Sequence, residues 1–266
     1  MYVQFDRRTC GFVDLGFRPP WRAQAYQEVP MAQPAIHLRS VVCLLDRFPA
    51  LTGIDLDVAE GEAVLVTGSN GAGKTTLLRL LAGLLPVASG DAQVFGCDLV
   101  RDRRAVRRRV GLLSEGTGCY DDLTVRENLL FRSRCAGLSA KTVDAAIEQW
   151  GLTRLADAVH AKMSTGERRR LAFAAMMIRE PDLLLLDEPH AGLDAKGRAL
   201  LAELVRDSSA RGRTVLIASH EITEARGLVS REVALVGGRM LSAPGVGADP
   251  AVARDVVARG AGASRA

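Results

Sequence analysis

Residues 68–76 read Gly-Ser-Asn-Gly-Ala-Gly-Lys-Thr-Thr and fit the pattern G-x-x-x-x-G-K-T. The apolar run at residues 63–66 precedes them and is typical of a buried strand, whereas leucines at helical spacing follow them. A glycine-rich turn between a strand and a helix can direct successive backbone N–H groups at phosphate oxygens, and the positive end of the helix strengthens the attraction. The segment is therefore a Walker A loop and predicts a nucleoside triphosphate as the ligand.

Individual residues of this loop have expected roles. Lys74 would contact the β- and γ-phosphates, and the hydroxyl of Thr75 would ligate Mg²⁺. An incidental glycine-rich turn is the alternative, but this spacing between a strand and a helix argues against it. We expect nucleotide contacts from the whole segment, that is, from Gly68, Ser69, Asn70, Gly71, Ala72, Gly73, Lys74, Thr75 and Thr76.

Two further apolar runs end in polar residues. Residues 183–186 are four leucines followed by Asp187 and Glu188, so two carboxylates lie at the carboxyl end of a buried strand, where open α/β sheets bind ligands. Asp187 would hold Mg²⁺ through its water shell, and Glu188 would polarise the attacking water. The alternative for this acidic pair is that it only caps the next helix. Residues 214–220 repeat the arrangement and end in His220, which we interpret as a γ-phosphate sensor rather than a structural histidine.

A helical region precedes these two strands. From residue 123 to about residue 179 the composition is helical, which predicts a helical subdomain inserted in an α/β core. Thr124 is the expected N-cap of its first helix, and Glu127 would complete a capping box. Near the end of the region, Ser164 and Gly166 precede another helix, and such an N-terminus can bind an anion. An ordinary capped helix is the alternative there.

Phe48 and the two ends of the chain lie outside these motifs. Phe48 fits either stacking on an adenine ring or a place in the hydrophobic core. Residues 1–33 are rich in proline, lack sustained periodicity and precede the first convincing strand at residues 36–38, so we predict a poorly ordered and dispensable extension, with Met31 as a candidate translation start. We expect one nucleotide-binding domain over residues 34–243 and a flexible tail over residues 244–266.

Composition excludes several other classes of protein. At 266 residues and 48% hydrophobic content, the chain can bury the core of one large α/β domain. No apolar run approaches the roughly 18–20 residues of a membrane span, and no secretory signal is visible, so we expect a cytoplasmic location.

The five cysteines form no C-x-x-C pair, which argues against a zinc site or a disulfide framework. The net charge is +4, and the basic run at residues 101–109 favours a solvated helix face over a nucleic-acid or anionic-lipid contact.

These motifs, in this order over about residues 35–242, resemble the ATP-binding subunit of ABC transporters. The resemblance implies a P-loop NTPase core of the α/β class, with a mostly parallel sheet, an antiparallel β subdomain and an inserted α-helical signature subdomain at about residues 116–180. It implies ATP and Mg²⁺ as cofactors. In that family residues 164–167 match the signature loop, so Ser164, Gly166 and Glu167 would contact nucleotide. Residues 191–194 match the D-loop, and His220 matches the switch histidine.

The chain departs from the family pattern at several positions. Met163 and Glu167 stand where leucine and glutamine are usual in the signature. The Q-loop glutamine is missing, with Glu115 or Gly116 in its place. If the Glu115 carboxylate points into the site it would act on Mg²⁺, and Glu115→Gln should then be active. Within the family, residues 112–118, 120–128 and 187–194 are similar to the haem-exporter ATPases of cytochrome c maturation, although drug and polysaccharide exporters share much of this pattern.

The resemblance also implies partners. A polytopic membrane permease would hold the chain at the inner face of the cell membrane. A second ATP-binding subunit would form a head-to-tail homodimer, and no nucleic acid is expected. A soluble ABC-type translation or repair factor and a P-loop kinase are the competing classes. The single Walker A loop, the lack of a heptad run and the presence of the signature favour the transporter ATPase.

Overall fold

The structure of the chain is a computed structural model that describes residues 34–114, 116–220 and 222–241. The predicted extension at residues 1–33, the tail at residues 244–266 and Glu115 lie outside the described residues. The predictions made for these three parts of the chain therefore remain predictions.

A small antiparallel sheet contains the first two strands of the described residues. Its order is β2 (Phe48–Val58), β1 (Ile36–Leu45), β4 (Ser89–Val94) and β5 (Cys97–Asp98). Ile54, Leu56 and Val58 are buried while the residues between them are exposed, which confirms the predicted alternation of a half-buried strand. β1 continues seven residues beyond the expected residues 36–38, because its whole length pairs with β2.

A larger sheet holds the strands that carry the predicted site. Its order is β10 (Arg239–Leu241), β9 (Arg231–Val236), β3 (Ala63–Thr67), β8 (Thr214–Ala218), β7 (Leu183–Asp187) and β6 (Val110–Leu113). The strands from β9 to β6 are parallel, and β10 pairs with β9 in the antiparallel direction. Every residue of β3, β7 and β8 is buried, as expected of continuous apolar runs in a parallel sheet.

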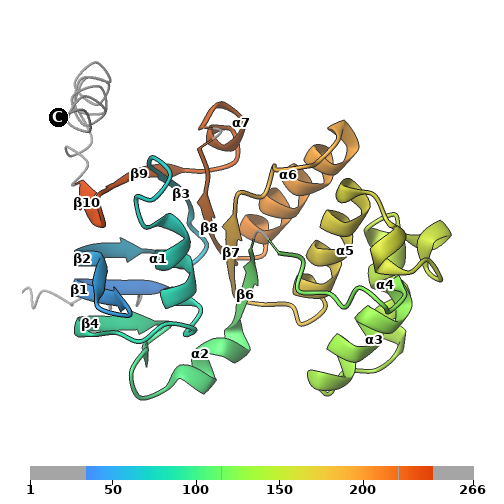
Figure 1. Ribbon diagram of the computed structural model, residues 1–266, viewed down its shortest axis with the longest axis horizontal. Coiled ribbons are helices and arrows are strands. Elements are labelled where there is room, and N and C mark those ends of the chain that lie inside the picture. The colour runs from blue at the N-terminus through green and yellow to red at the C-terminus, as the bar shows by residue number, and fades with distance from the viewer. Residues whose placement is uncertain (1–33, 115, 221, 242–266) are drawn as a thin grey trace, which may run out of the picture. The chain divides into compact units, whose positions relative to one another are not determined.

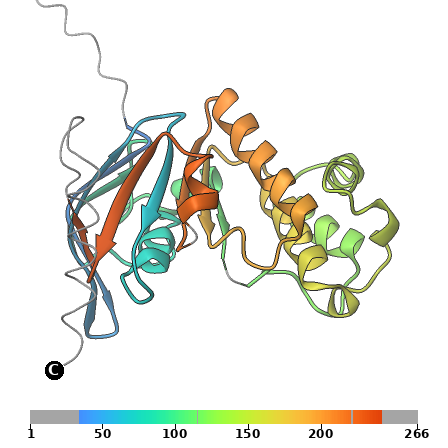
Figure 2. The same ribbon diagram turned by 90° about the horizontal axis from the view of Figure 1, so that it is seen from above.

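Helices flank the larger sheet on both faces (Figure 1). In the described part of the chain the helices are α1 (Lys74–Leu81), α2 (Arg103–Arg109), α3 (Val125–Cys135), α4 (Lys141–Gln149), α5 (Thr165–Met177), α6 (Ala195–Ala210) and α7 (Ile222–Arg226), with 3₁₀ turns at Thr153–Leu155 and His160–Lys162. Of these, α3 packs against α4 and α5 rather than on the sheet. Figure 2 shows α3, α4 and α5 gathered beside α6. α3 to α5 fall inside the range predicted for the helical subdomain, and the Thr124–Glu127 capping box is confirmed.

The buried side chains form two clusters on opposite faces of the parallel sheet. β3 contributes Val64 and Val66 to one cluster and Leu65 to the other, because successive residues of a strand point to opposite faces. The first cluster packs α1 against strands of both sheets. The second packs α3 to α6, and within it Trp150 and Phe173 stack with their ring centroids 5.2 Å apart. The residues that follow β3 are thus held between two cores.

The basic run forms α2, and several of its arginines have structural partners. Arg103 and Arg107 donate to backbone carbonyls of residues 99 and 83, and Arg109 pairs with Asp182 at 2.6 Å. Val106 is the buried residue of the helix. Most arginines of the run are exposed, in agreement with the predicted solvated helix face. None of the helices in the described part of the chain is long and apolar enough to span a bilayer.

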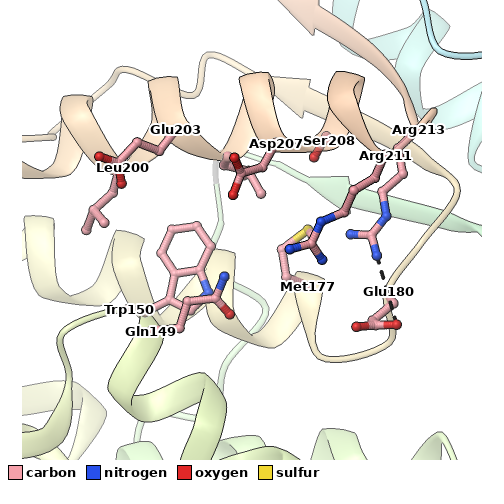
Figure 3. Close-up of a pocket in the computed structure, with 11 residues that line it drawn as sticks. Gln149, Trp150, Met177, Glu180, Leu200, Glu203, Asp207, Ser208, Arg211 and Arg213 are labelled. Atoms are coloured by element: carbon pink, nitrogen blue, oxygen red, sulfur yellow. Dashed lines mark ion pairs between the residues drawn. The ribbon is translucent and has the colours of Figure 1, made fainter.

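A cavity of about 130 Å³ lies where the ends of α4 and α5 approach α6 (Figure 3). Trp150, Met177, Leu200 and Leu204 form its apolar part, and its polar residues include Glu203. Arg213 and Glu180 pair across its edge at 3.9 Å. None of the predicted site residues lines this cavity, so it lies apart from the nucleotide chemistry.

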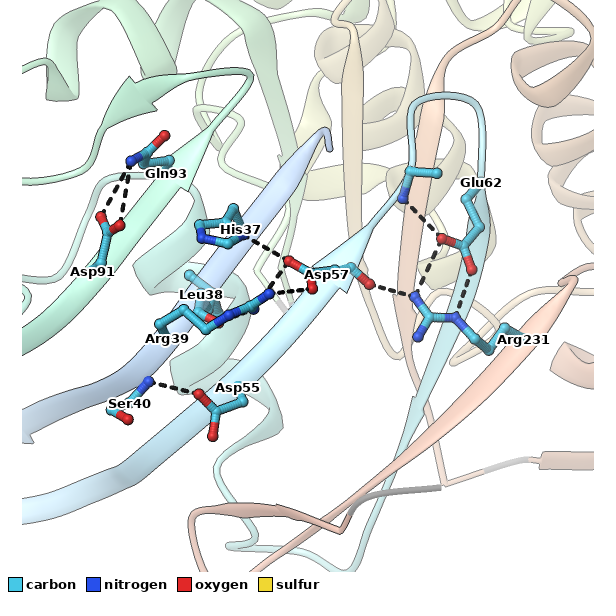
Figure 4. Close-up of polar contacts among 11 residues, drawn as sticks. His37, Leu38, Arg39, Ser40, Asp55, Asp57, Glu62, Asp91, Gln93 and Arg231 are labelled. Atoms are coloured by element: carbon cyan, nitrogen blue, oxygen red, sulfur yellow. Dashed lines mark hydrogen bonds and ion pairs between the residues drawn. The ribbon is translucent and has the colours of Figure 1, made fainter. Parts of the chain in front are cut away.

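Polar contacts tie the two sheets together around Asp57 and Glu62 (Figure 4). The Asp57 carboxylate accepts hydrogen bonds from Arg39 at 2.5 and 3.0 Å and lies 2.7 Å from Nδ1 of His37. Arg231 of β9 pairs with Glu62 at 2.6 Å and donates to the backbone carbonyl of Asp57. The hydrogen bond from Arg39 and the proximity of His37 lower the pKa of Asp57.

Asp57→Asn should lower the melting temperature at neutral pH by a few degrees at most, because the lost pairs are partly exposed. A carboxylate with a lowered folded-state pKa stabilises the fold above its unfolded pKa of about 3.9, and this contribution disappears as the pH falls through the folded value. Thermal melts from pH 7 down to acid should therefore show the two proteins converging. A gap that persists at the lowest pH would contradict this account, and exposed Asp122→Asn is the matched control.

Candidate active site

The Walker A loop connects β3 to α1, as predicted, and its shape requires glycine. Gly73 is the N-cap of α1 with φ 106°, a left-handed conformation that other residues rarely adopt. At Gly68 a side chain is excluded, because its Cβ would lie 2.3 Å from the carbonyl oxygen of Leu235. The loop therefore approaches neighbouring backbone closely, and this packing holds its N–H groups at the start of the helix.

Lys74 lies inside this loop rather than in solvent. The residue is 7% exposed, and its Nζ donates to the carbonyl oxygens of Gly68 at 2.8 Å and Ser69 at 3.2 Å. These bonds hold the ammonium beside the loop backbone, at the positive end of α1. An anion bound by the loop would meet this charge, so the arrangement fits a nucleotide phosphate.

Thr75 and Asp187 bring the Walker A loop and the end of β7 together. Thr75 Oγ1 donates to Asp187 Oδ2 at 2.7 Å, although 112 residues separate them in sequence. Burial raises the pKa of the Asp187 carboxyl, and the neighbouring charge of Glu188 adds to this rise. A hydroxyl and a carboxylate are ligands that Mg²⁺ prefers, typically together with waters and substrate phosphates. The pair fits that arrangement, whereas Glu115 lies outside the described residues.

Glu188 and His220 meet because β7 and β8 are neighbours in register. Asp187 pairs with Ala218 in the sheet, so the residues beyond both strand ends emerge side by side. Glu188 Oε1 lies 2.8 Å from Nδ1 of His220 and 3.2 Å from its backbone nitrogen. Ser219 Oγ donates to the other carboxylate oxygen at 3.1 Å. Sequence patterns predicted both Glu188 and His220 as functional, but they indicated neither this pairing nor the role of Ser219.

The strand ends differ slightly from the prediction. β8 ends at Ala218, so His220 lies two residues beyond the strand rather than at its last position. The His220 side chain is 58% exposed and that of Glu188 27%. The Glu188 carboxylate accepts from the Ser219 hydroxyl and the backbone N–H of His220, lies beside the His220 ring and still reaches solvent, so it can accept a hydrogen bond from an attacking water. This geometry suits the role predicted for Glu188.

His220→Ala should leave MgATP binding nearly unchanged and lower turnover by about 100-fold or more. The substitution removes the Nδ1 contact that orients the Glu188 carboxylate, whereas the Ser219 hydroxyl and the backbone N–H of residue 220 still hold it. Steady-state phosphate release and equilibrium nucleotide binding separate the two effects. Turnover within about twofold of wild type would contradict the role, and His37→Ala on the other sheet is the control.

The signature segment begins α5 as a capped helix. The Ser164 side chain accepts the backbone N–H of Glu167 at 3.4 Å, and Glu167 Oε2 accepts that of Ser164 at 2.8 Å. This second bond lowers the pKa of Glu167. Glutamine and glutamate both complete such a box, which explains how the chain accommodates Glu167. Met163 is buried and replaces leucine by a side chain of similar volume.

The signature loop lies against the D-loop of the same chain. A Cβ on Gly166 would lie 3.5 Å from the carbonyl oxygen of Gly192, and one on Gly192 would lie 2.8 Å from Thr165 Cγ2. Ser164, Thr165, Ala191 and Gly192 are all exposed. These four residues form an exposed ridge, named the signature ridge below, on α5 and the segment before α6.

Phe48 is 81% exposed at the start of β2, which excludes the core interpretation. Two residues later, the carbonyl oxygen of Ala50 approaches Gly73 of the Walker A loop, because a Cβ on Gly73 would lie 3.0 Å from it. Phe48 thus belongs to a strand that passes the nucleotide loop. Stacking on adenine stays a prediction.

Together the fold and this strand-end chemistry define a P-loop ATPase. The family model described as "ABC transporter" matches residues 51–191. The chain therefore belongs to the ABC transporter family and is an ATP-binding ATPase, which confirms the predicted fold class and the resemblance drawn from the sequence.

Three curated relatives place the chain among transporter ATP-binding proteins. It is 36% identical over 220 residues to "Nod factor export ATP-binding protein I" of Rhizobium meliloti, covering 80% of this chain and 66% of the relative. It is 40% identical over 197 residues to "Daunorubicin resistance ATP-binding protein DrrA3" of Streptomyces coeruleorubidus, covering 73% and 62%. "ABC transporter ATP-binding protein NatA" of Bacillus subtilis is 34% identical over 197 residues, covering 72% and 80%. The chain thus spans somewhat less than two thirds of the length of the first two relatives.

Two solved structures share the fold. One is described as the structure of an ATP-binding subunit of an ABC transporter, with a TM-score of 0.72, 25% identity, and coverage of 77% of this chain and 88% of the other. The second is a dimeric post-hydrolysis state of an ATP-binding cassette bound to ADP and Pi, with a TM-score of 0.69, 25% identity and coverage of 77% and 96%. Both are ATP-binding domains of the same family.

Proposed function

We propose that the chain is the ATP-hydrolysing subunit of an ABC-2-type exporter and drives transport through a separate polytopic membrane permease. The named relatives support export, since the name of one includes export and the name of another includes daunorubicin resistance. In this proposal the domain at residues 34–243 lies on the inner face of the cell membrane, held there by the permease.

Two copies would act as a head-to-tail pair. The observation that carries this proposal is the exposed signature ridge: within the described residues it contacts the D-loop and its own helix, and Ser164 forms no hydrogen bond with residues 68–76. Ser164, Gly166 and Glu167 of one copy would complete the nucleotide site formed by the Walker A loop of the second copy. The dimeric structural relative bound to ADP and Pi supports this assembly.

Within each composite site, residues of this chain would divide the work. The Walker A loop and Lys74 would bind the phosphates, and Thr75 and Asp187 would hold Mg²⁺, whose positive charge would stabilise negative charge on the phosphoryl oxygens. Glu188 accepts the hydrogen bond of the attacking water, and His220 keeps the Glu188 carboxylate oriented. Stacking of Phe48 on the adenine completes the nucleotide contacts.

The permease would select the cargo. The similarity of residues 112–118, 120–128 and 187–194 to haem-exporter ATPases favours haem as a second candidate. The named relatives support an ABC-2-type exporter of another small molecule. Identifying the transported molecule would therefore distinguish the haem exporter from this second kind of exporter.

The decisive experiment is to co-express the chain with a candidate polytopic membrane protein and reconstitute the purified complex in vesicles. We expect a stable complex whose ATPase rate rises with cargo and whose Glu188→Gln version neither hydrolyses nor transports. Haem and an amphipathic drug such as daunorubicin are the first cargo probes. A chain that forms no complex with the membrane protein, or whose ATPase is stimulated only by RNA or ribosomes, would contradict the proposal.

A further inference from the structure

Arg169 lies in α5, five residues after the signature serine, and is 5% exposed. Its Nη1 donates to the carbonyl oxygen of Ser114 at 2.6 Å. Its Nη2 donates to the carbonyl oxygens of Asp187 at 2.9 Å and Glu188 at 2.8 Å. One side chain thus joins three separate segments: the signature helix, the residue before the Q-loop position, and the end of β7.

The bond to Glu188 matters because the backbone there is unusual. Glu188 has φ 45°, a left-handed conformation that a residue with a Cβ keeps only when its surroundings hold it. Its N–H donates to the carbonyl oxygen of Ala218 at 2.8 Å, and its own carbonyl oxygen accepts from Arg169. These bonds on either side of the Cα fix the direction of the carboxylate side chain. Arg169 does this without touching the carboxylate itself.

Guanidinium chemistry suits Arg169 to this position. Its planar group stays charged and carries five donors in a fixed fork, so it can bond carbonyls of two segments at once. A lysine has a single ammonium and cannot reproduce that span. Ser164 is the N-cap of α5 and lies about 7.5 Å along the helix axis from Arg169, so a shift of the signature loop moves the guanidinium as well.

We infer that Arg169 is a positioning residue that couples the signature loop of each chain to the catalytic carboxylate of the same chain. The coupling to the signature loop, unlike the positioning of Glu188, rests on the composite site proposed above. When the loop engages the nucleotide of the partner copy, α5 and Arg169 settle together, and the Glu188 backbone is held in its active conformation. Hydrolysis at one site then depends on occupancy of the other.

The test compares Arg169→Lys and Arg169→Gln with Arg170→Gln, which removes the same charge one position along α5. Both Arg169 variants should keep MgATP affinity within about twofold and lower kcat at least about 10-fold, with lysine less affected than glutamine. The Hill coefficient for ATP should fall from above 1 in wild type to about 1, while Arg170→Gln should behave as wild type. Wild-type kcat and cooperativity in the Arg169 variants, or an equal kcat loss in Arg170→Gln, would overturn the inference.

Two further measurements separate positioning from folding and from assembly. If the Arg169 variants bind no nucleotide, or melt so low that kcat falls with the fraction folded, Arg169 is structural and the inference fails. In a Glu188→Gln background, Arg169→Lys should still form the MgATP-dependent dimer, and a monomer in this double variant alone would also overturn the inference. If Glu188→Gln alone stays monomeric, both the composite site and the coupling between the two copies are wrong. In that case the kcat of Arg169→Lys alone tests whether Arg169 positions Glu188.

Discussion

Glu188→Gln is expected to lower ATP turnover by about 100- to 10,000-fold while MgATP still binds. Glutamine has nearly the same shape, and its amide oxygen can still accept from Ser219 Oγ and the backbone N–H of His220. It lacks the negative charge that polarises the attacking water. Phosphate release measured beside equilibrium binding of a fluorescent nucleotide gives both quantities on one preparation.

A matched control for this change is Glu203→Gln, because Glu203 lies at an exposed position of α6 away from the nucleotide site. That variant should hydrolyse ATP at the wild-type rate. If Glu188→Gln keeps wild-type turnover, another group activates water, and the chemistry assigned to the end of β7 is wrong.

Lys74→Ala should weaken ATP binding by about 10- to 100-fold, the cost of losing hydrogen bonds made by a charged, buried group. The change removes the ammonium expected at the β- and γ-phosphates. It also removes the two bonds that tie the loop to itself at the carbonyl oxygens of Gly68 and Ser69. Isothermal titration with MgATP measures the loss.

The corresponding control is Lys196→Ala, at an exposed position of α6, and this variant should bind MgATP with wild-type affinity. Thermal melts without nucleotide show whether the Lys74 variant is folded. A folded Lys74→Ala protein with wild-type affinity would contradict the role of Lys74. That result would leave the loop backbone as the main phosphate-binding element.

Local patterns predicted the parts of the site that depend on neighbours in sequence. The strand, glycine turn and helix at residues 63–81 lie next to one another in the chain, so their spacing specifies both geometry and chemistry. The four leucines before Asp187 predicted a buried strand for the same reason. The capping box at Thr124 and Glu127 is also a local feature.

What the sequence did not reveal depends on packing between distant segments. The contact of Glu188 with Ser219 and His220 follows from the register of β7 against β8, which no local pattern specifies. The left-handed backbone of Glu188 has no sequence signal, because glycine does not mark it. Arg169 stands in a run of three arginines that looks like a solvated surface, and only the fold buries it beneath the end of β7.

The central claim is that two copies of this chain share their nucleotide sites through the signature ridge. Size-exclusion chromatography with light scattering on Glu188→Gln tests it most directly, with and without MgATP. The account predicts a monomer without nucleotide, a species of twice that mass in saturating MgATP, and a return to monomer when Ser164→Arg adds bulk and charge to the ridge. A Glu188→Gln protein that binds MgATP yet stays monomeric even with its membrane partner, or a Ser164→Arg double variant that dimerises equally well, would contradict it.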